Sequence, residues 1–546
     1  MGVCNLWTLV RFSLLCLPFY QGATAVSNPI VETQRGTYQG TVSEYVDDVN
    51  VFKGIRYADP PTGQYRWAHP PHPAGFTGVK NATTFGNACP AGGPGPGSTA
   101  DEDCLFLNIW TPEGFTNTSS YPVFFWIYGG RFESGSGSDL TYDGSGLAKK
   151  GVVVVTMNYR LGALGFLAHP ELSAQTGYNG SGNWGLMDQQ AALHWTNENI
   201  QLFGGNSSRI TIGGQSAGAA SVLDHVYSPQ ASGLFQGAIA ESGARAPCDP
   251  LTESLATSHL DLSTAEAHGT SFLTSLNVST IAEARNLSLA TILGVRTQSD
   301  TTFVGTPFDD NEAYIEPPYF RPNIDNYILL YNYAQSLALN NHSDVPVMTG
   351  NNKDESGAAY PSPNVNITTF KSSNEGIFAP IGLADEFFRL FPAANDNEAN
   401  NQTNNFYRNQ SLVSSWLWAD AWTAGGAKSN VYTYYWTHAP PGQTSGAFHG
   451  SEVNYVLDNM PWGTTLTGQT LNWTSQDYMI ADVMSNYWVN FISTGNPNGA
   501  NLAHWAPSSN TTRSTMTLGD GYGTVKVASD TVVEFIEDYF SHEAAN

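Results

Sequence analysis

The chain has 546 residues, of which 41% are hydrophobic, so it is long and apolar enough to bury a large core. Its 47 acidic and 22 basic residues give a net charge of −25. This balance argues against nucleic acid and anionic membrane surfaces as partners, because both are polyanions that bind basic side chains.

The N-terminal residues 1–25 predict a signal peptide. Arg11 precedes an apolar run over 12–20, and Ala23-Thr24-Ala25 fits a cleavage site. The run is too short to span a bilayer, which takes about 20 apolar residues, and no later stretch or C-terminal signal indicates a membrane anchor. We therefore expect a secreted protein, with one catalytic domain over 26–546 because no linker or repeat divides it.

N-x-S/T sequons recur along the chain and, behind a leader, predict N-linked glycans. They begin at twelve asparagines: Asn81, Asn117, Asn179, Asn206, Asn277, Asn286, Asn341, Asn366, Asn401, Asn409, Asn472 and Asn510.

Three of the five cysteines follow the leader. In an oxidising compartment Cys89 and Cys104 are the natural disulfide pair, and Cys248 is expected to be a buried, inert thiol.

Strand-like and helix-like segments alternate over most of the first half of the chain. The continuous apolar runs 123–128 and 151–156 are typical of parallel strands buried on both faces. A helix is expected over 183–203, and it is followed by Gly204-Gly205. Further strands are expected at 210–212, 237–240, 345–348 and 431–436. The alternation predicts an α/β fold with a large, mostly parallel central sheet and helices on both faces.

A G-x-S-x-G motif lies at Gly214-Gln215-Ser216-Ala217-Gly218, between the strand at 210–212 and a helix-compatible segment at 219–223. At such a sharp strand-to-helix turn the serine hydroxyl is exposed at the carboxyl edge of the sheet. The small neighbours are needed because the turn is strained and the helix packs close to the strand. Ser216 is therefore the candidate nucleophile.

A serine nucleophile needs a base and an acid that orients the base, and in this kind of sheet both follow the serine in the chain. His449 and His438 are the candidate bases, both downstream of the strand at 431–436, with His449 favoured by its small neighbours. Asp354 and Glu355 both follow the strand at 345–348. Spacing alone does not choose between these two acids.

An oxyanion hole is expected where the strand at 123–128 runs into Gly129-Gly130-Arg131-Phe132. Backbone amides at such a glycine turn, together with the amide of Ala217 just after the nucleophile, can bind a developing negative charge. Glycine permits the backbone angles that this turn requires.

The chain resembles the type-B carboxylesterase family, the cholinesterase-like branch of the α/β-hydrolases, and looks closest to secreted fungal carboxylesterases and lipases. The resemblance covers nearly all of the mature chain. It is carried by these blocks: 52–61 (FKGIRYADPP), 102–108 (EDCLFLN), 183–190 (NWGLMDQQ), 203–206 (FGGN), the G-x-S-x-G motif and 496–498 (NPN).

The resemblance implies an α/β-hydrolase fold and a Ser216, Glu355 and His449 triad, with oxyanion amides from Gly130, Arg131 and Ala217. It also implies that Arg160 with Asp188 and Arg66 with Glu102 form structural ion pairs, and that Cys89–Cys104 is a disulfide. No metal or cofactor is needed.

Three positions depart from the family pattern. Arg131 occupies the usual third glycine or alanine of the oxyanion turn, so its side chain needs an exit. Gln215 stands where many relatives carry a glutamate that would hold a cationic substrate. The loop between Cys89 and Cys104 has only fourteen residues and no aromatic side chain, whereas in the family it forms a lipase lid or carries a choline-binding tryptophan.

These features predict a secreted serine carboxylesterase that cleaves soluble, short- to medium-chain esters through an acyl-enzyme. Its partner is then a small-molecule ester. A triacylglycerol or sterol-ester lipase is the alternative within the family. A non-catalytic binding protein, as some cholinesterase-like relatives are, is disfavoured because Ser216, Glu355 and His449 are all present.

Overall fold

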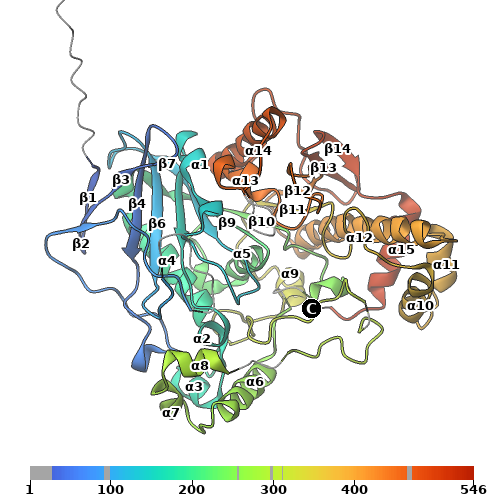
Figure 1. Cartoon of the computed structure of the whole chain (residues 1–546), viewed down its shortest axis with the longest axis horizontal. Helices are drawn as coiled ribbons and strands as arrows, with labels where there is room; N and C mark the ends of the chain where they lie inside the picture. The colour runs from blue at the N-terminus through green and yellow to red at the C-terminus, as the bar shows by residue number, and fades with distance from the viewer. Residues whose placement is uncertain are drawn as a thin grey trace, which may run out of the picture.

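A computed structural model describes residues 28–90, 99–254, 258–295, 299–309, 311–463 and 470–545. The predicted signal peptide lies outside these residues. The central feature is an eleven-stranded sheet in the order β14-β13-β12-β11-β10-β9-β7-β8-β6-β4-β3, shown with its helices in Figure 1. A second sheet of three strands has the order β1-β2-β5.

The strands and helices have the following bounds. The strands are β1 Ile30–Thr33, β2 Gly36–Gln39, β3 Thr41–Val42, β4 Val49–Arg56, β5 Val79–Asn81, β6 Phe106–Pro112, β7 Tyr121–Ile127, β8 Val153–Met157, β9 Gly205–Gln215, β10 Gly237–Glu241, β11 Val347–Asn352, β12 Val431–Trp436, β13 Ser514–Leu518 and β14 Gly523–Lys526. The helices are α1 Ser145–Lys149, α2 Gly162–Phe166, α3 Pro170–Gln175, α4 Trp184–Asn199, α5 Ala217–Tyr227, α6 Leu262–Ser275, α7 Ile281–Arg285, α8 Leu289–Gly294, α9 Tyr333–Ala338, α10 Ile367–Phe378, α11 Ala384–Leu390, α12 Asp396–Gly425, α13 Val453–Leu457, α14 Ser475–Thr494 and α15 Asp530–Ser541.

The large sheet is parallel in its centre and antiparallel at both ends. Six of its ten strand pairings are parallel, and they run without interruption from β13 to β8. The pairings β13–β14, β8–β6, β6–β4 and β4–β3 are antiparallel. The mostly parallel sheet predicted from the sequence is present, and each predicted strand lies in or overlaps one of β7 to β12. The antiparallel ends were not predicted.

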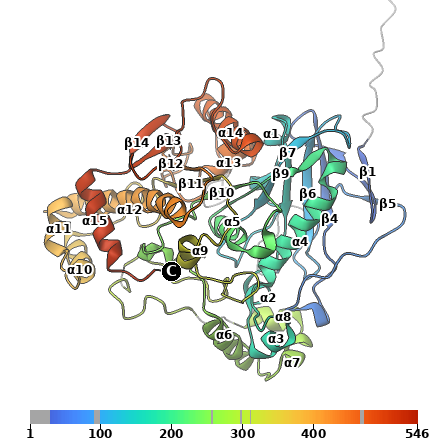
Figure 2. The same cartoon turned by 180° about the vertical axis from the view of Figure 1, so that it is seen from behind.

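The central strands bury both faces because alternate side chains enter two different hydrophobic cores. In β7, Val123, Phe125 and Ile127 pack in the core that contains α4 and α5. Phe124 and Trp126 pack on the opposite face, in the core that contains α1, α13 and α14. Figure 2 shows these helices on the two sides of the sheet. The predicted arrangement of helices on both faces is therefore observed.

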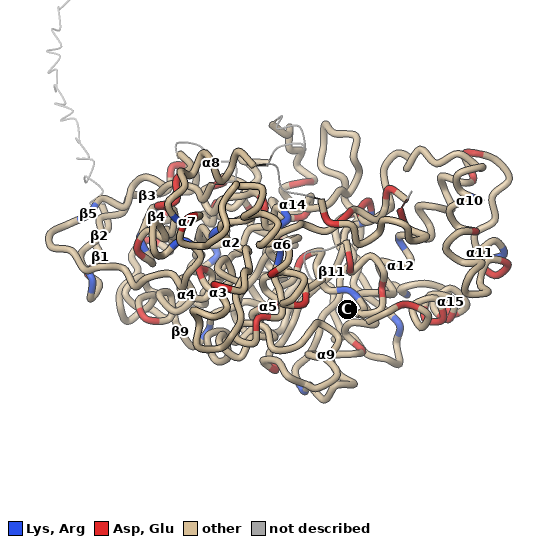
Figure 3. Tube along the Cα trace, turned by 90° about the horizontal axis from the view of Figure 1, so that it is seen from below, with Lys and Arg blue, Asp and Glu red and all other residues tan. Residues whose placement is uncertain are grey.

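A third core lies at the end of the molecule opposite β1 and β2, where α10, α11, α12 and α15 pack together. Acidic positions occur throughout the trace in Figure 3 and are not confined to one end. Among the described residues, no helix is long and apolar enough to cross a membrane.

Candidate active site

The G-x-S-x-G motif forms a sharp turn between β9, which ends at Gln215, and α5, which begins at Ala217. Ser216 has φ 60° and ψ −126°, a strained conformation for a residue with a side chain. A Cβ atom at either Gly214 or Gly218 would overlap the carbonyl oxygen of Ile127 in β7. Both glycines are therefore required by the close approach of β9, α5 and the neighbouring strand, as the sequence predicts.

The glycine turn after β7 presents free backbone donors. Gly130 has φ 111° and Arg131 has φ 59°, so both lie in the left-handed region. A Cβ at Gly130 would overlap the Ser134 carbonyl oxygen. Within the described residues, the backbone N–H groups of Gly130, Arg131 and Ala217 donate to no protein acceptor. All three residues line one cavity with Ser216, so these donors are free for a ligand oxygen.

The loop after β11 and the loop after β12 are hydrogen-bonded to each other. Asp354 and Phe448 form an isolated parallel bridge, and the Asp354 N–H donates to the Ala447 carbonyl at 3.0 Å. The Asp354 carboxylate accepts from the Ala447 N–H at 2.8 Å and pairs with Arg408 at 2.5 Å. Asp354 therefore fixes the two loops, and its carboxylate is already occupied.

The next residue, Glu355, faces the imidazole of His449. Nδ1 of His449 lies 2.6 Å from Oε2 of Glu355, and the Asn352 N–H donates to Oε1 at 2.8 Å. The carboxylate is 2% exposed and the imidazole 46%. Burial raises the pKa of Glu355, but the hydrogen bond and charge of His449 outweigh it and hold that pKa below its usual range.

His449 shows the reciprocal effect. Burial lowers the pKa of His449, yet the hydrogen bond and charge of Glu355, with the charge of Glu452, raise it above its ordinary value of 6.5 overall. The contact with Glu355 fixes Nδ1 as the protonated nitrogen of the neutral ring, which leaves Nε2 unprotonated and able to act as an acceptor.

The Nε2 atom is hydrogen-bonded to the side chain of Gln215 rather than to Ser216. The Gln215 amide nitrogen lies 3.1 Å from Nε2, whereas no hydrogen bond joins Ser216 to His449 in the described part of the chain. Ser216, Gln215 and His449 all line the same cavity. The structure thus brings the serine and the imidazole to one site, with Gln215 bonded to the nitrogen that would accept the serine proton.

Two further buried carboxylates were missed by the sequence analysis: Glu452, whose charge acts on His449, and Glu241, whose pKa responds to the charge of Glu452. Glu452 is fully buried and accepts from Asn352 Nδ2 at 2.5 Å; burial, followed by the charge of Glu355, raises its pKa to about 7. Glu241, at the end of β10, is also fully buried and accepts from Trp488 at 2.8 Å. Burial and the charge of Glu452 raise the pKa of Glu241 well above its ordinary value. The sequence signal that could have identified Glu452 is its position three residues after His449.

The alternative base, His438, is held elsewhere. Its Nδ1 lies 2.5 Å from Asp520 and its Nε2 lies 3.0 Å from Asp477, at the N-terminal turn of α14. It is absent from the described residues that line the Ser216 cavity. Of the two candidate histidines, only His449 is placed beside Ser216.

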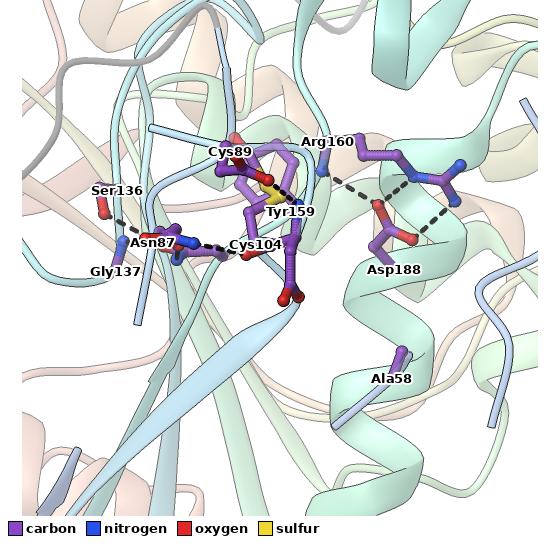
Figure 4. The surroundings of a disulfide bond; sticks show 12 residues. Ala58, Asn87, Cys89, Cys104, Ser136, Gly137, Tyr159, Arg160 and Asp188 are labelled. Carbon is purple, nitrogen blue, oxygen red and sulfur yellow. Dashed lines mark hydrogen bonds and ion pairs between the residues drawn. A yellow bond between two sulfur atoms is a disulfide. The ribbon is translucent and has the colours of Figure 1, made fainter. Parts of the chain in front are cut away.

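Cys89 and Cys104 form the expected disulfide, with Cα atoms 5.0 Å apart and both residues fully buried. Figure 4 shows it close to Tyr159 and to the Arg160–Asp188 ion pair, where Arg160 Nε lies 2.7 Å from Asp188. Arg66 and Glu102 form the second expected pair at 2.5 Å. Residues 91–98 of the disulfide loop lie outside the described chain. Cys248 is free as expected, but it is half-buried rather than buried.

The cavity beside Ser216 has a volume of about 530 Å³, within the range of small-molecule sites. Its apolar wall is formed by Ala220, Leu251, Ala313, Ile315 and Pro318. It combines a strained serine, an imidazole oriented by a buried carboxylate and free backbone donors. This arrangement can carry out acyl transfer through a covalent serine intermediate.

Comparison with known proteins identifies the family. Residues 27–532 match the family described as "Carboxylesterase family". The chain belongs to this family. It is 32% identical to the fumonisin B1 esterase of Sphingopyxis macrogoltabida, over 90% of this chain and 88% of that protein. It is 31% identical to the cholinesterase of Mus musculus, over 94% of this chain and 86% of that protein.

A solved structure of a PNB esterase matches the fold with a TM-score of 0.73 and 28% identity, covering 93% of this chain and all of that one. The architecture is thus the α/β-hydrolase fold, as the sequence predicts. The family and the esterase relatives make this protein a carboxylic ester hydrolase of the serine type.

Proposed function

We propose that Ser216 attacks the ester carbonyl while His449 takes its proton, giving an acyl-enzyme that water then hydrolyses. Glu355 holds the imidazole with Nε2 unprotonated and stabilises the imidazolium. The amides of Gly130, Arg131 and Ala217 bind the oxyanion, each worth about 3 kcal/mol by comparison with measured cases. The observation that carries this proposal is the Glu355–His449 contact in the same cavity as the strained Ser216.

Gln215 must release Nε2 during this reaction. In the resting enzyme its amide N–H donates to the unprotonated nitrogen. Once His449 is an imidazolium, Nε2 carries a proton and no longer accepts that bond. Ser216 and Gln215 therefore alternate at Nε2, and the protonated ring is free to deliver its proton to the leaving alcohol.

A fluorophosphonate probe tests the mechanism directly, since it labels an activated serine. The native enzyme should be labelled stoichiometrically, and Ser216→Ala should be neither labelled nor active. Labelling of the Ser216→Ala protein at another residue, with ester hydrolysis retained, would overturn the assignment.

We propose soluble esters with short to medium acyl chains as the substrate class. The apolar wall of a cavity of about 530 Å³ suits a short to medium acyl chain. The disulfide loop is short, which supports an open cavity that substrates enter directly rather than one covered by a mobile lid. A panel of p-nitrophenyl esters of increasing length should give its highest kcat/KM at intermediate length. A sharp rise of activity at the oil–water interface would favour a lipase instead.

We further propose that the protein is secreted and carries N-linked glycans. All twelve sequon asparagines are at least partly exposed, so none needs local unfolding to be modified. The buried Cys89–Cys104 disulfide also suits an oxidising compartment. Expression of the full chain in a eukaryotic host should place the protein in the medium, with a mobility that increases after treatment with an N-glycanase. Retention of an unmodified protein in the cytosol would contradict this proposal.

A further inference from the structure

We propose that Arg131 makes this esterase select esters that carry a free carboxylate. This inference rests on the proposed function, because it concerns substrates of the Ser216 site. Arg131 is one of the three departures from the family pattern noted in the sequence. Its backbone N–H belongs to the proposed oxyanion hole, so its side chain begins beside the reacting carbonyl.

The side chain leaves the turn along the wall of the cavity. Its Nη2 donates to the carbonyl oxygen of Glu316 at 2.7 Å. Glu316 lies between Ile315 and Pro318, which both line the cavity together with Arg131. The guanidinium therefore lies beside the segment 311–318, here called the rim segment, and not in the core of the protein. The Arg131 side chain is 41% exposed.

Most of the hydrogen-bonding capacity of Arg131 is unused. A guanidinium has five N–H donors, and in the described part of the chain only the bond to Glu316 engages one of them. Among the described residues, the one carboxylate within 4 Å of the Arg131 guanidinium is that of Glu133, whose Oε2 lies 3.8 Å from Nε, beyond hydrogen-bond distance. Both side chains of this pair are about half exposed, so the pairing is weak.

The described wall of the cavity carries little negative charge that could compete for Arg131. Among its described lining residues, the only carboxylate is Glu355, which is 2% exposed and bonded to His449 and the Asn352 N–H. Gln215, the neighbour of the nucleophile, is uncharged. A substrate carboxylate would thus meet a cation with free donors, opposed within 4 Å only by the half-exposed carboxylate of Glu133 among the described residues. Arg–carboxylate contacts are short and frequently bidentate, which gives orientation as well as attraction.

Matched substrates test the proposal on the whole enzyme. p-Nitrophenyl hydrogen adipate and p-nitrophenyl hexanoate have acyl chains of equal length, and only the first carries a terminal carboxylate. 4-Carboxyphenyl hexanoate and phenyl hexanoate place the charge on the alcohol side instead. For each pair, the ratio of kcat/KM values for the anionic and neutral ester is compared between native enzyme and variant, so intrinsic reactivity cancels.

Arg131→Gln should lower this ratio about five- to tenfold for at least one pair, and the pair affected shows which side of the ester meets the guanidinium. Arg131→Lys should restore part of the ratio. Glu133→Gln leaves the oxyanion turn unchanged and should raise the ratio about twofold. This variant tests the proposal if Arg131→Gln does not fold.

The proposal is overturned if Arg131→Gln slows both members of each pair equally, because Arg131 then only braces the rim segment. It is also overturned if Glu133→Gln leaves both ratios unchanged. Failure of the proposed function looks different: hydrolysis of all four esters would then persist in Ser216→Ala.

Discussion

The floor of the active-site cavity and its rim are built in different ways. The floor, defined as residues 129–131 and 214–218, consists of turns at the ends of β7 and β9, where glycines allow backbones to touch. The rim segment, residues 311–318, belongs to neither a helix nor a strand and includes the 58% exposed Ile315. Parallel strands fix the floor, whereas the rim is held by side chains such as Arg131. The difference suggests that the floor determines whether ester hydrolysis occurs and the rim determines which ester is used.

The largest expected effect comes from the imidazole next to the floor. His449→Ala should lower kcat by about 10⁵-fold or more, because comparable removals of a catalytic histidine have costs near that size. The measurement is steady-state hydrolysis of p-nitrophenyl hexanoate. His438→Ala is the matched control: it should keep kcat within about threefold while lowering the melting temperature, since its hydrogen-bond partners among the described residues are Asp477 and Asp520 alone. Equal losses in the two variants would contradict the assignment.

The second-largest expected effect distinguishes the roles of the adjacent acids Glu355 and Asp354. Glu355→Gln should lower kcat by about 10³- to 10⁴-fold, because the amide no longer stabilises the imidazolium and favours the wrong tautomer. Asp354→Asn should cost about 1–3 kcal/mol of stability through its pair with Arg408, with a far smaller loss of kcat. Unfolding in urea and single-turnover kinetics measure the two quantities. A larger kcat loss for Asp354→Asn would reverse the roles.

The pH profile probes the contact between Gln215 and His449. The pKa of His449 is raised above 6.5, and only the neutral ring accepts a proton, so kcat/KM should fall as the pH decreases through that pKa. Gln215→Glu places a carboxylate beside Nε2, which stabilises the imidazolium. The acid limb of the profile should therefore move upward by about one pH unit, equivalent to about 1.4 kcal/mol.

Glu452→Gln provides the opposite shift as a control. The charge of Glu452 raises the pKa of His449, so its removal should move the acid limb downward. An acid limb that stays fixed in both variants would mean that a group other than His449 governs the profile.

The floor could be predicted from the sequence and the surroundings of the imidazole could not. The G-x-S-x-G motif and the glycine turn are local patterns whose glycines have a steric cause, so residues 214–218 and 129–131 fold as expected. The bond between Gln215 and His449 joins residues 234 positions apart, and no periodicity encodes such a contact. Asp354 and Glu355 are consecutive residues whose spacing from β11 differs by only one, so the sequence alone left them as alternatives. The loop bridge at Phe448 turns one carboxylate towards Arg408 and the other towards His449.

The same contrast explains the errors at the periphery. Continuous apolar runs identify central parallel strands, but β4 and β6, which pair antiparallel, were not predicted. Cys248 was expected to be a buried, inert thiol, yet it lies half-buried beside the third core, where burial and the charge of Glu543 raise the pKa of its thiol. For short strands and single small residues outside the central sheet, the sequence pattern does not predict the degree of burial.

The smallest effect tests whether the rim chooses the substrate without changing the chemistry. Ile315→Ser removes an exposed apolar side chain from the cavity wall, so contact with a longer acyl chain is lost. The kcat/KM for p-nitrophenyl hexanoate should fall about two- to fivefold, corresponding to partial burial of one aliphatic side chain, while that for the acetate stays the same. Leu339→Ser, at a residue 60% exposed and away from the cavity, should change neither. Equal losses for acetate and hexanoate would mean that the rim acts on the floor, and the division between the two regions would then fail.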